Sequence, residues 1–306
     1  MTTPADLAAD TAVRRDEAVP GRYAIAMPTH WDYLLPSGGV VMTAALRAAA
    51  AELGDPGMRL ASATTIFASP IHPGALVADV HVIRRGKGAS QLRVVLKHAT
   101  PPADAPAEEN AGMECLVTFV RHGRKGPDVI GTAMPAWAKS LADSVPVEDD
   151  DPGNPHARLR FYHQIECRIA DGARHWRAGD PAFTAGPARY ARWIRYRAPQ
   201  RGADGLLDRL ALPPLLDTMP TALHRAIGPR PYRFYAPSLD LTAYVVDDTA
   251  SEWLLVATTV KRARGGWGIG DAEVWDDAGR LVAYGTQAMY LHGLAGEPPI
   301  VDATQQ

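Results

Sequence analysis

The sequence predicts an α+β protein made of two similar units, each with an antiparallel sheet wrapped around one long helix. Each half of the chain contains one helical segment followed by several strand-like segments. Short turns rich in glycine and proline separate these strand-like segments, which is typical of antiparallel pairing. A stretch rich in proline and acidic residues lies between the two halves.

In the first half, a helix is expected from Val40 to Leu53. Ser37 is a suitable N-cap and Gly54 a suitable C-cap. The many alanines of this helix let another backbone approach closely. The strand-like segments that follow are Leu60–Ser69, Ala75–Arg84, Ser90–His98 and Gly112–His122.

The stretch Val145–Pro155 contains three adjacent acidic residues between prolines, which suits a linker. We therefore predict an N-terminal unit over residues 20–145, a linker over 146–157 and a C-terminal unit over 158–294. A long surface loop within one domain is the alternative. Residues 1–22 lack the apolar segment of a signal peptide and are expected to form a frayed tail.

The second half repeats the order of elements. Residues 158–171 alternate between apolar and polar side chains, which predicts a strand with one buried face. A helix is expected from Pro213 to Ile227, closed by Gly228. The other predicted strands are Arg189–Arg197, Arg233–Val246, Trp253–Arg264, Gly268–Trp275 and Arg280–Leu291.

The composition excludes several classes of protein. A net charge of −2 and a pI of about 6.6 argue against a protein that coats nucleic acid. No run of 18 apolar residues occurs, so no membrane span is expected, and we predict a cytoplasmic protein. Cys115 and Cys167 are interpreted as buried thiols of a reducing compartment, with a disulfide or a nucleophile as the alternatives.

Most familiar catalytic motifs are absent from the sequence. There is no GxSxG, HExxH, CxxC or Walker motif. The glycines of Gly265–Gly270 precede a strand-like run instead of a helix, so a hairpin turn is expected there. The ten histidines have no ligand spacing. No metal and no cofactor are therefore predicted.

Several segments, taken in order, resemble the double-hotdog acyl-CoA thioesterases of the type II class. In the first half these segments are Leu35–Gly39, Phe67–Gly74 and Val82–Gly86; in the second they are Pro237–Thr242, Glu252–Leu255, Trp275–Ala283 and Gln287. The resemblance covers roughly residues 23–291. It implies two fused hotdog units and an acyl-CoA substrate.

The resemblance also implies an aspartate, a serine or threonine, and a glutamine that together hold a water for attack on the thioester carbonyl. Asp240 corresponds to the aspartate and Gln287 to the glutamine. The hydroxyl position falls on Lys261, which has no hydroxyl. Thr259 lies two residues earlier, hence on the same strand face, and is the alternative hydroxyl.

Physical chemistry gives these residues plausible roles. Asp240 stands between two leucines, where a carboxylate is costly unless it is paired or used, and it could act as a general base. Gln287 could orient a water but not deprotonate it. Lys261 could instead pair with Asp240 and weaken its basicity, or extend into solvent.

The start of the first helix is expected to bind the substrate through Gly38, Gly39 and Val40. A helix N-terminus offers free N–H groups and a positive dipole end, which suit an oxyanion. The two glycines could instead serve close helix packing. Trp31 is a candidate for the wall of an acyl pocket, with core packing as the alternative.

Three functions remain open at this point. The first is hydrolysis of a fatty or related acyl-CoA thioester through Asp240 and Gln287. The second is binding of acyl-CoA or an apolar ligand without hydrolysis, because Lys261 replaces the hydroxyl. The third is a hydratase or dehydratase, for which His224 is the available histidine. Free sheet edges predict a homo-oligomer, and no nucleic-acid or membrane partner is expected.

Overall fold

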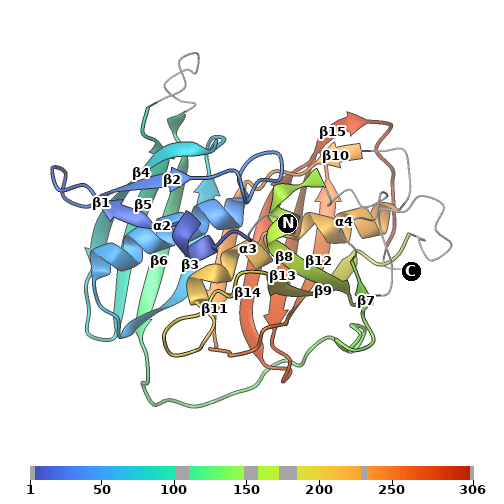
Figure 1. Cartoon of the computed structure of the whole chain (residues 1–306). Helices are drawn as coiled ribbons and strands as arrows, with labels where there is room; N and C mark the ends of the chain where they lie inside the picture. The colour runs from blue at the N-terminus through green and yellow to red at the C-terminus, as the bar shows by residue number, and fades with distance from the viewer. Residues whose placement is uncertain (1–3, 101–109, 148–157, 172–184, 229–232, 304–306) are drawn as a thin grey trace.

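The computed structural model describes residues 4–100, 110–147, 158–171, 185–228 and 233–303. Its main feature is one antiparallel sheet of 13 strands, in the order β1-β2-β4-β5-β6-β3-β11-β14-β13-β12-β9-β8-β7. Figure 1 shows α2 (Gly38–Leu53) lying against one half of this sheet, while α3 (Pro213–Leu216) and α4 (Pro220–Ile227) lie against the other. The predicted α+β double-hotdog class is confirmed.

The first half surrounds α2 with six strands. These are β1 (Val13–Arg15), β2 (Arg22–Met27), β3 (Met58–Phe67), β4 (Gly74–Arg84), β5 (Ala89–His98) and β6 (Met113–Arg121). Gly54 ends α2 as predicted, with a left-handed φ of 63° and its N–H donated to the Ala50 carbonyl. The Ser37 side chain makes no capping hydrogen bond to this helix.

The second half supplies the other strands of the large sheet and a separate pair. The large sheet contains β7 (Val145–Pro146), β8 (Ile165–Ile169), β9 (Arg189–Tyr196), β11 (Asp240–Val245), β12 (Leu254–Arg264), β13 (Trp267–Trp275) and β14 (Leu281–Tyr290), and the pair is β10 (Arg233–Tyr235) with β15 (His292–Ala295). Antiparallel pairing of β3 with β11 joins the halves, with Ala63 opposite Ala243. The two halves of the chain therefore share one continuous sheet.

The second predicted helix is interrupted. Instead of one helix from Pro213 to Ile227, the chain forms α3 and α4 with a break at residues 217–219. Pro220 explains the break, because a proline ring clashes with the carbonyl four residues earlier and disfavours helical backbone before it. The prediction of a continuous helix is wrong. The break between α3 and α4 lies at the candidate active site.

Two predicted strands are also divided. Residues 158–171 contain a 3₁₀ helix, Arg160–Gln164, ahead of β8. Phe161 is fully buried in this turn, where its ring lies 4.7 Å from the Tyr33 ring and 6.2 Å from the Trp31 ring. The segment 233–246 forms β10 and β11, which belong to different sheets. The packing of Phe161 against other aromatic rings divides the first predicted strand. The passage of the chain from one sheet to the other, between β10 and β11, divides the second.

The N-terminus is ordered beyond what the sequence suggests. Leu7–Asp10 forms α1, and β1 pairs with β2. Leu7 is fully buried, and Asp10 accepts a hydrogen bond from Trp31 Nε1 at 2.8 Å. The prediction of a frayed tail as far as residue 22 is therefore wrong.

The chain between the halves covers the outer face of the second half's sheet. Met134, Trp137 and Leu141 pack there against a small buried cluster that includes Trp193 and Trp275. The Trp193 Nε1 group donates to the carbonyl of residue 139 at 3.0 Å. Residues 148–157 of the predicted linker lie outside the described residues, so the proposed division into units stays a prediction.

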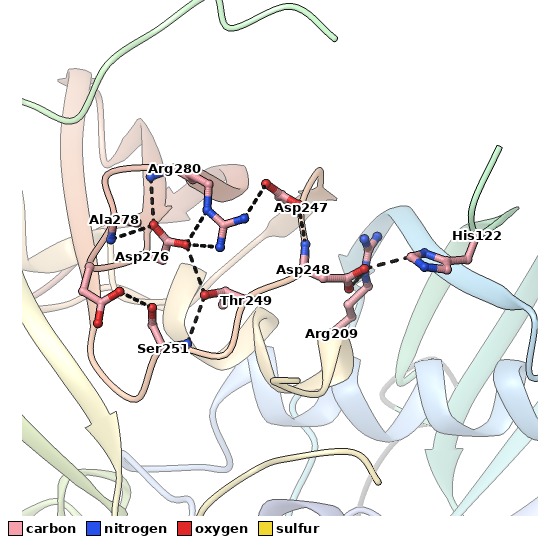
Figure 2. Close-up of polar contacts among 10 residues, drawn as sticks. His122, Arg209, Asp247, Asp248, Thr249, Ser251, Asp276, Ala278 and Arg280 are labelled. Atoms are coloured by element: carbon pink, nitrogen blue, oxygen red, sulfur yellow. Dashed lines mark hydrogen bonds and ion pairs between the residues drawn. The ribbon is translucent and has the colours of Figure 1, made fainter. Parts of the chain in front are cut away.

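A polar network holds the turn between β13 and β14 (Figure 2). Asp276 is fully buried and accepts from the backbone N–H groups of Ala278 and Arg280 and from the Thr249 hydroxyl. The Arg280 guanidinium binds the same carboxylate at 2.7 Å. The segment Trp275–Ala283, which carries part of the family resemblance, therefore stabilises a turn.

Two further findings concern the possibility of a membrane-spanning helix and of a cysteine nucleophile. Within the described ranges, no helix is both long and apolar enough to cross a membrane. Cys115 and Cys167 form no disulfide, and burial raises the pKa of Cys115 to about 12. A thiol with so high a pKa is a poor nucleophile.

Candidate active site

A buried carboxylate occupies the break between α3 and α4. Asp217 follows the last residue of α3, and its backbone N–H donates to the Pro213 carbonyl at 3.1 Å. The helix cannot continue because of Pro220, so the Asp217 side chain turns into the protein. Only 6% of Asp217 is exposed.

Four neutral donors surround the Asp217 carboxylate. Its Oδ2 accepts from the Ser37 hydroxyl and from the Gly39 N–H, each at 2.9 Å. Its Oδ1 accepts from the Ser238 hydroxyl at 2.9 Å and from Gln287 Nε2 at 2.6 Å. The first pair of donors lies in the first half of the chain and the second pair in the second half, so the site depends on both.

The electrostatics of Asp217 are unusual for a buried acid. No lysine, arginine or histidine of the described part of the chain forms an ion pair with it. Burial raises the pKa of Asp217 above its usual range, although the hydrogen bonds from Gly39, Ser37, Ser238 and Gln287 act in the opposite direction. The group is therefore a stronger base than an ordinary aspartate.

Gln287 and Ser238 complete a polar cluster around Oδ1. Gln287 lies on β14 and is 2% exposed, and its Nε2 also donates to the Ser238 hydroxyl. Gln287 Oε1 is buried and has no hydrogen-bond partner among the described residues. An orphaned acceptor of this kind indicates a place for a donor that the protein itself does not supply.

A cavity of about 520 Å³ opens beside this cluster. Asp217, Ser238, Ser37 and Gly38 contribute to one part of its wall. The remaining lining is mostly apolar or aromatic, and it includes Tyr33, Leu34, Leu35, Val41, Phe67, Ile71, Leu159, Tyr162, His224 and Phe234. A large apolar space with a few converging polar groups is the usual form of a small-molecule site. No cluster of metal-ligating side chains occurs in the part of the chain that is described.

Asp240 does not share this site. Along β11 the buried residues Leu241, Ala243 and Val245 face the helices, so Asp240 lies on the opposite face of the sheet. Its Oδ1 accepts from the backbone N–H of Ala288 at 2.8 Å. The expectation that Asp240 converges with Gln287 is therefore corrected, because the alternation of the two strands separates their side chains.

Thr259 and Lys261 also lie away from the cavity. On β12 the inward positions are Thr258 and Val260, which are buried. Lys261 is exposed, and its Nζ pairs with Asp271 Oδ2 at 2.7 Å. Thr259 therefore does not bring its hydroxyl into the cavity. Lys261 pairs with Asp271 and not with Asp240.

The start of α2 reaches the site, but in a different way from that expected. A Cβ atom on Gly39 would lie 2.5 Å from the Pro213 carbonyl oxygen, so Gly39 is required for contact between α2 and α3. Its N–H is bonded to Asp217. Gly38 lines the cavity, whereas Val40 and Trp31 are fully buried and do not. Trp31 therefore belongs to the core.

The signals for the missed residues were present in the sequence. Asp217 stands between Pro213 and Pro220, in a segment where a proline should interrupt a helix. Ser238 is the hydroxyl residue two positions before Asp240, in the same segment that carries the family resemblance. Choosing among the two aspartates required knowledge of which side chains face inward.

Family models match most of the chain. The model of the acyl-CoA thioesterase N-terminal domain matches residues 27–125, and that of the acyl-CoA thioesterase C-terminal domain matches residues 142–291. This chain belongs to the double-hotdog acyl-CoA thioesterase family. No curated protein sequence matches it.

Solved structures agree with the fold of this thioesterase-family protein. A protein of unknown function with a hot dog fold from Alicyclobacillus acidocaldarius is 19% identical, with a TM-score of 0.74 and coverage of 96% of this chain and 98% of that one. An acyl-CoA thioesterase II from Mycobacterium marinum is 20% identical, with a TM-score of 0.66 and coverage of 95% and 100%. At these identities the likeness supports the fold alone.

Proposed function

We propose that this protein hydrolyses an acyl-CoA thioester by direct attack of water, with Asp217 as the general base. The observation that carries the proposal is the Asp217 carboxylate itself. It is buried at the wall of the cavity and hydrogen-bonded to both Ser238 and Gln287. This cluster contains the aspartate, hydroxyl and glutamine that the family resemblance implies.

The environment of Asp217 suits proton abstraction. A general base works best when its pKa lies near the working pH, and burial shifts Asp217 in that direction. Water would give its proton to Asp217 Oδ1 while its oxygen attacks the thioester carbonyl. The protonated acid would then return the proton to the departing thiolate, so no covalent intermediate is needed.

Gln287 would hold the attacking water, and Ser238 would orient the Asp217 carboxylate. Gln287 Oε1 has no partner among the described residues and belongs to the same amide whose Nε2 lies 2.6 Å from Asp217 Oδ1. A water bound there could donate one hydrogen to Oε1 and the other to the carboxylate. Ser238 donates to Oδ1 and keeps the carboxylate oriented.

Gly38 is the best candidate for the oxyanion donor. Its backbone N–H belongs to the first turn of α2, where N–H groups have no acceptor within the helix, and Gly38 lines the cavity. The positive end of the helix dipole would stabilise the oxygen of the tetrahedral intermediate. The mostly apolar remainder of the cavity would receive the acyl chain.

A thiol-release assay over a panel of acyl-CoA chain lengths tests this proposal. We expect Asp217→Asn to lower kcat/KM by about 10³-fold, within the range of a lost general base. The matched control is Asp240→Asn, an aspartate on the other sheet face, which should stay within a few-fold of wild type. Equal losses in the two variants would contradict the site assignment, and wild-type binding without turnover would favour a non-hydrolytic role.

A further inference from the structure

A buried arginine lies behind the wall of the cavity. Arg192 is on β9, where Tyr190 and Ile194 on either side of it face the same buried interior. Only 3% of Arg192 is exposed. The next arginine along this strand, Arg195, points to the opposite face and lies partly in solvent.

Among the described residues, the contacts of Arg192 include no counter-ion for its charge. Its Nη1 donates to the Tyr162 hydroxyl at 3.2 Å. The guanidinium carbon lies 5.5 Å from the centre of the Tyr162 ring and 5.7 Å from that of Tyr190. No carboxylate in the described part of the chain forms an ion pair with it, in contrast to Arg195, which pairs with Glu166 at 2.7 Å.

This arrangement is energetically expensive for the protein alone. A guanidinium stays protonated in proteins, so burial cannot neutralise it. One neutral hydrogen bond and two aromatic faces offset only part of the cost of removing the charge from water. A bound anion would supply the missing partner, and arginine favours carboxylates because its N–H groups match the two oxygens.

The arginine is connected to the cavity through tyrosines. Tyr162, which accepts the Arg192 hydrogen bond, lines the cavity together with Tyr33. Burial raises the pKa of Tyr33, on which the charges of Asp217 and Arg192 act in opposite directions. Tyr33 is therefore within electrostatic range of both the hydrolytic cluster and the buried cation.

We propose that Arg192, together with Tyr162, recognises a carboxylate at the far end of the acyl group, so that the preferred substrates are thioesters of dicarboxylic acids. This proposal rests on hydrolysis at Asp217 as described above. The water activated by Asp217 would attack the thioester carbonyl at one end of the acyl group, while Arg192 would select the charge at the other. The rest of the apolar wall would contact the methylene chain between them.

Matched pairs of substrates test the proposal directly. Wild-type kcat/KM is measured for straight-chain monocarboxylic and dicarboxylic acyl-CoA of equal carbon number, such as butyryl with succinyl and hexanoyl with adipoyl. We expect a preference of at least about tenfold for the dicarboxylic member at the best chain length, since a charged hydrogen bond contributes about 1.5 kcal/mol or more. A monocarboxylic preference at every length would overturn the proposal.

Variants separate the charge from the fold. Arg192→Met should lower the dicarboxylic-to-monocarboxylic ratio by about tenfold or more, and Arg192→Lys should lower it less. Arg195→Met is the control for a charge lost from the same strand and should leave the ratio unchanged. An unaltered ratio in a folded Arg192→Met protein would also overturn the proposal.

A binding measurement distinguishes this proposal from the hydrolytic one. If wild type releases no thiol from any substrate, titration calorimetry with the same CoA pairs still reports the anion site. Tighter binding of the dicarboxylic member, lost in Arg192→Met, would support the role of Arg192 while hydrolysis fails. Equal affinities within each pair would reject the anion site.

Discussion

Two buried aspartates of this protein have opposite surroundings. Asp276 is fully buried in the turn between β13 and β14, where the Arg280 guanidinium pairs with it at 2.7 Å. Asp217 is almost as buried, yet its four donors are all neutral. In the sequence, both aspartates directly follow apolar residues, Leu216 and Trp275. The two carboxylates therefore differ in their partners and not in their burial: a cation binds Asp276, whereas only neutral groups bind Asp217.

The consequences follow from the electrostatics. A buried acid that is paired with a cation holds that cation and the backbone groups around it in place. A buried acid with only neutral donors remains costly to ionise, so it retains affinity for a proton. In this protein the first arrangement ties the β13–β14 turn to the β11–β12 loop through Thr249 (Figure 2). The second faces a cavity.

The largest effect on stability is expected at the paired carboxylate. Asp276→Ala should lower the free energy of unfolding by about 3 kcal/mol, because two turn N–H groups and the Arg280 guanidinium lose their acceptor. Chemical denaturation at neutral pH measures this change. The exposed neighbour serves as control, since Asp277→Ala should change stability by about 0.5 kcal/mol or less. Similar losses in both variants would show that Asp276 does not hold the turn.

The pH dependence of hydrolysis should sharpen the contrast between Asp217 and Asp276. Asp217 must be deprotonated to act as a base, and burial raises its pKa. The value of kcat/KM should therefore fall about tenfold per pH unit below that raised pKa, beginning at a higher pH than for an ordinary aspartate with a pKa near 3.9. A pH–rate profile checks this. A profile flat down to the usual aspartate range would argue against Asp217 as the base.

The smallest effect is expected on stability at Asp217. Because folding raises the pKa of Asp217, the proton-bound form is favoured in the folded state, and this contribution is lost as the pH rises through that pKa. Asp217→Asn removes the cost of ionisation, and a 180° turn of the Gln287 amide would let the new Nδ2 group donate to Gln287 Oε1, which has no partner among the described residues. Stability at neutral pH should stay unchanged or rise by up to about 1 kcal/mol.

Comparing thermal unfolding of Asp217→Asn with wild type at two pH values tests that prediction. The stability advantage of the variant over wild type should shrink as the pH falls through the raised pKa of Asp217, because wild-type Asp217 then becomes neutral as well. A loss of more than about 2 kcal/mol at neutral pH would mean that the carboxylate is structural, like Asp276.

The sequence alone determined the class of fold and most of its strands. Periodic apolar residues and turn residues are local signals, so they predicted α2 with its Gly54 cap and located β3, β4, β5 and β6 to within a few residues. The resemblance placed Gln287 in the family's glutamine position. Gln287 does lie in the polar cluster.

Tertiary structure decided which aspartate stands beside Gln287. Asp240 was the reasonable choice from the strand sequence. Successive side chains of a strand alternate between the two faces of the sheet, however, and this alternation puts Asp240 on the face away from the helices. Asp217 is brought to Ser37 and Gly39 by contact between α2 and α3, across roughly 180 residues of sequence. Such convergence depends on how two helices cross a shared sheet, which no local pattern records. For the same reason the sequence could not reveal that Arg192 is buried with no carboxylate partner among the residues that the structure describes.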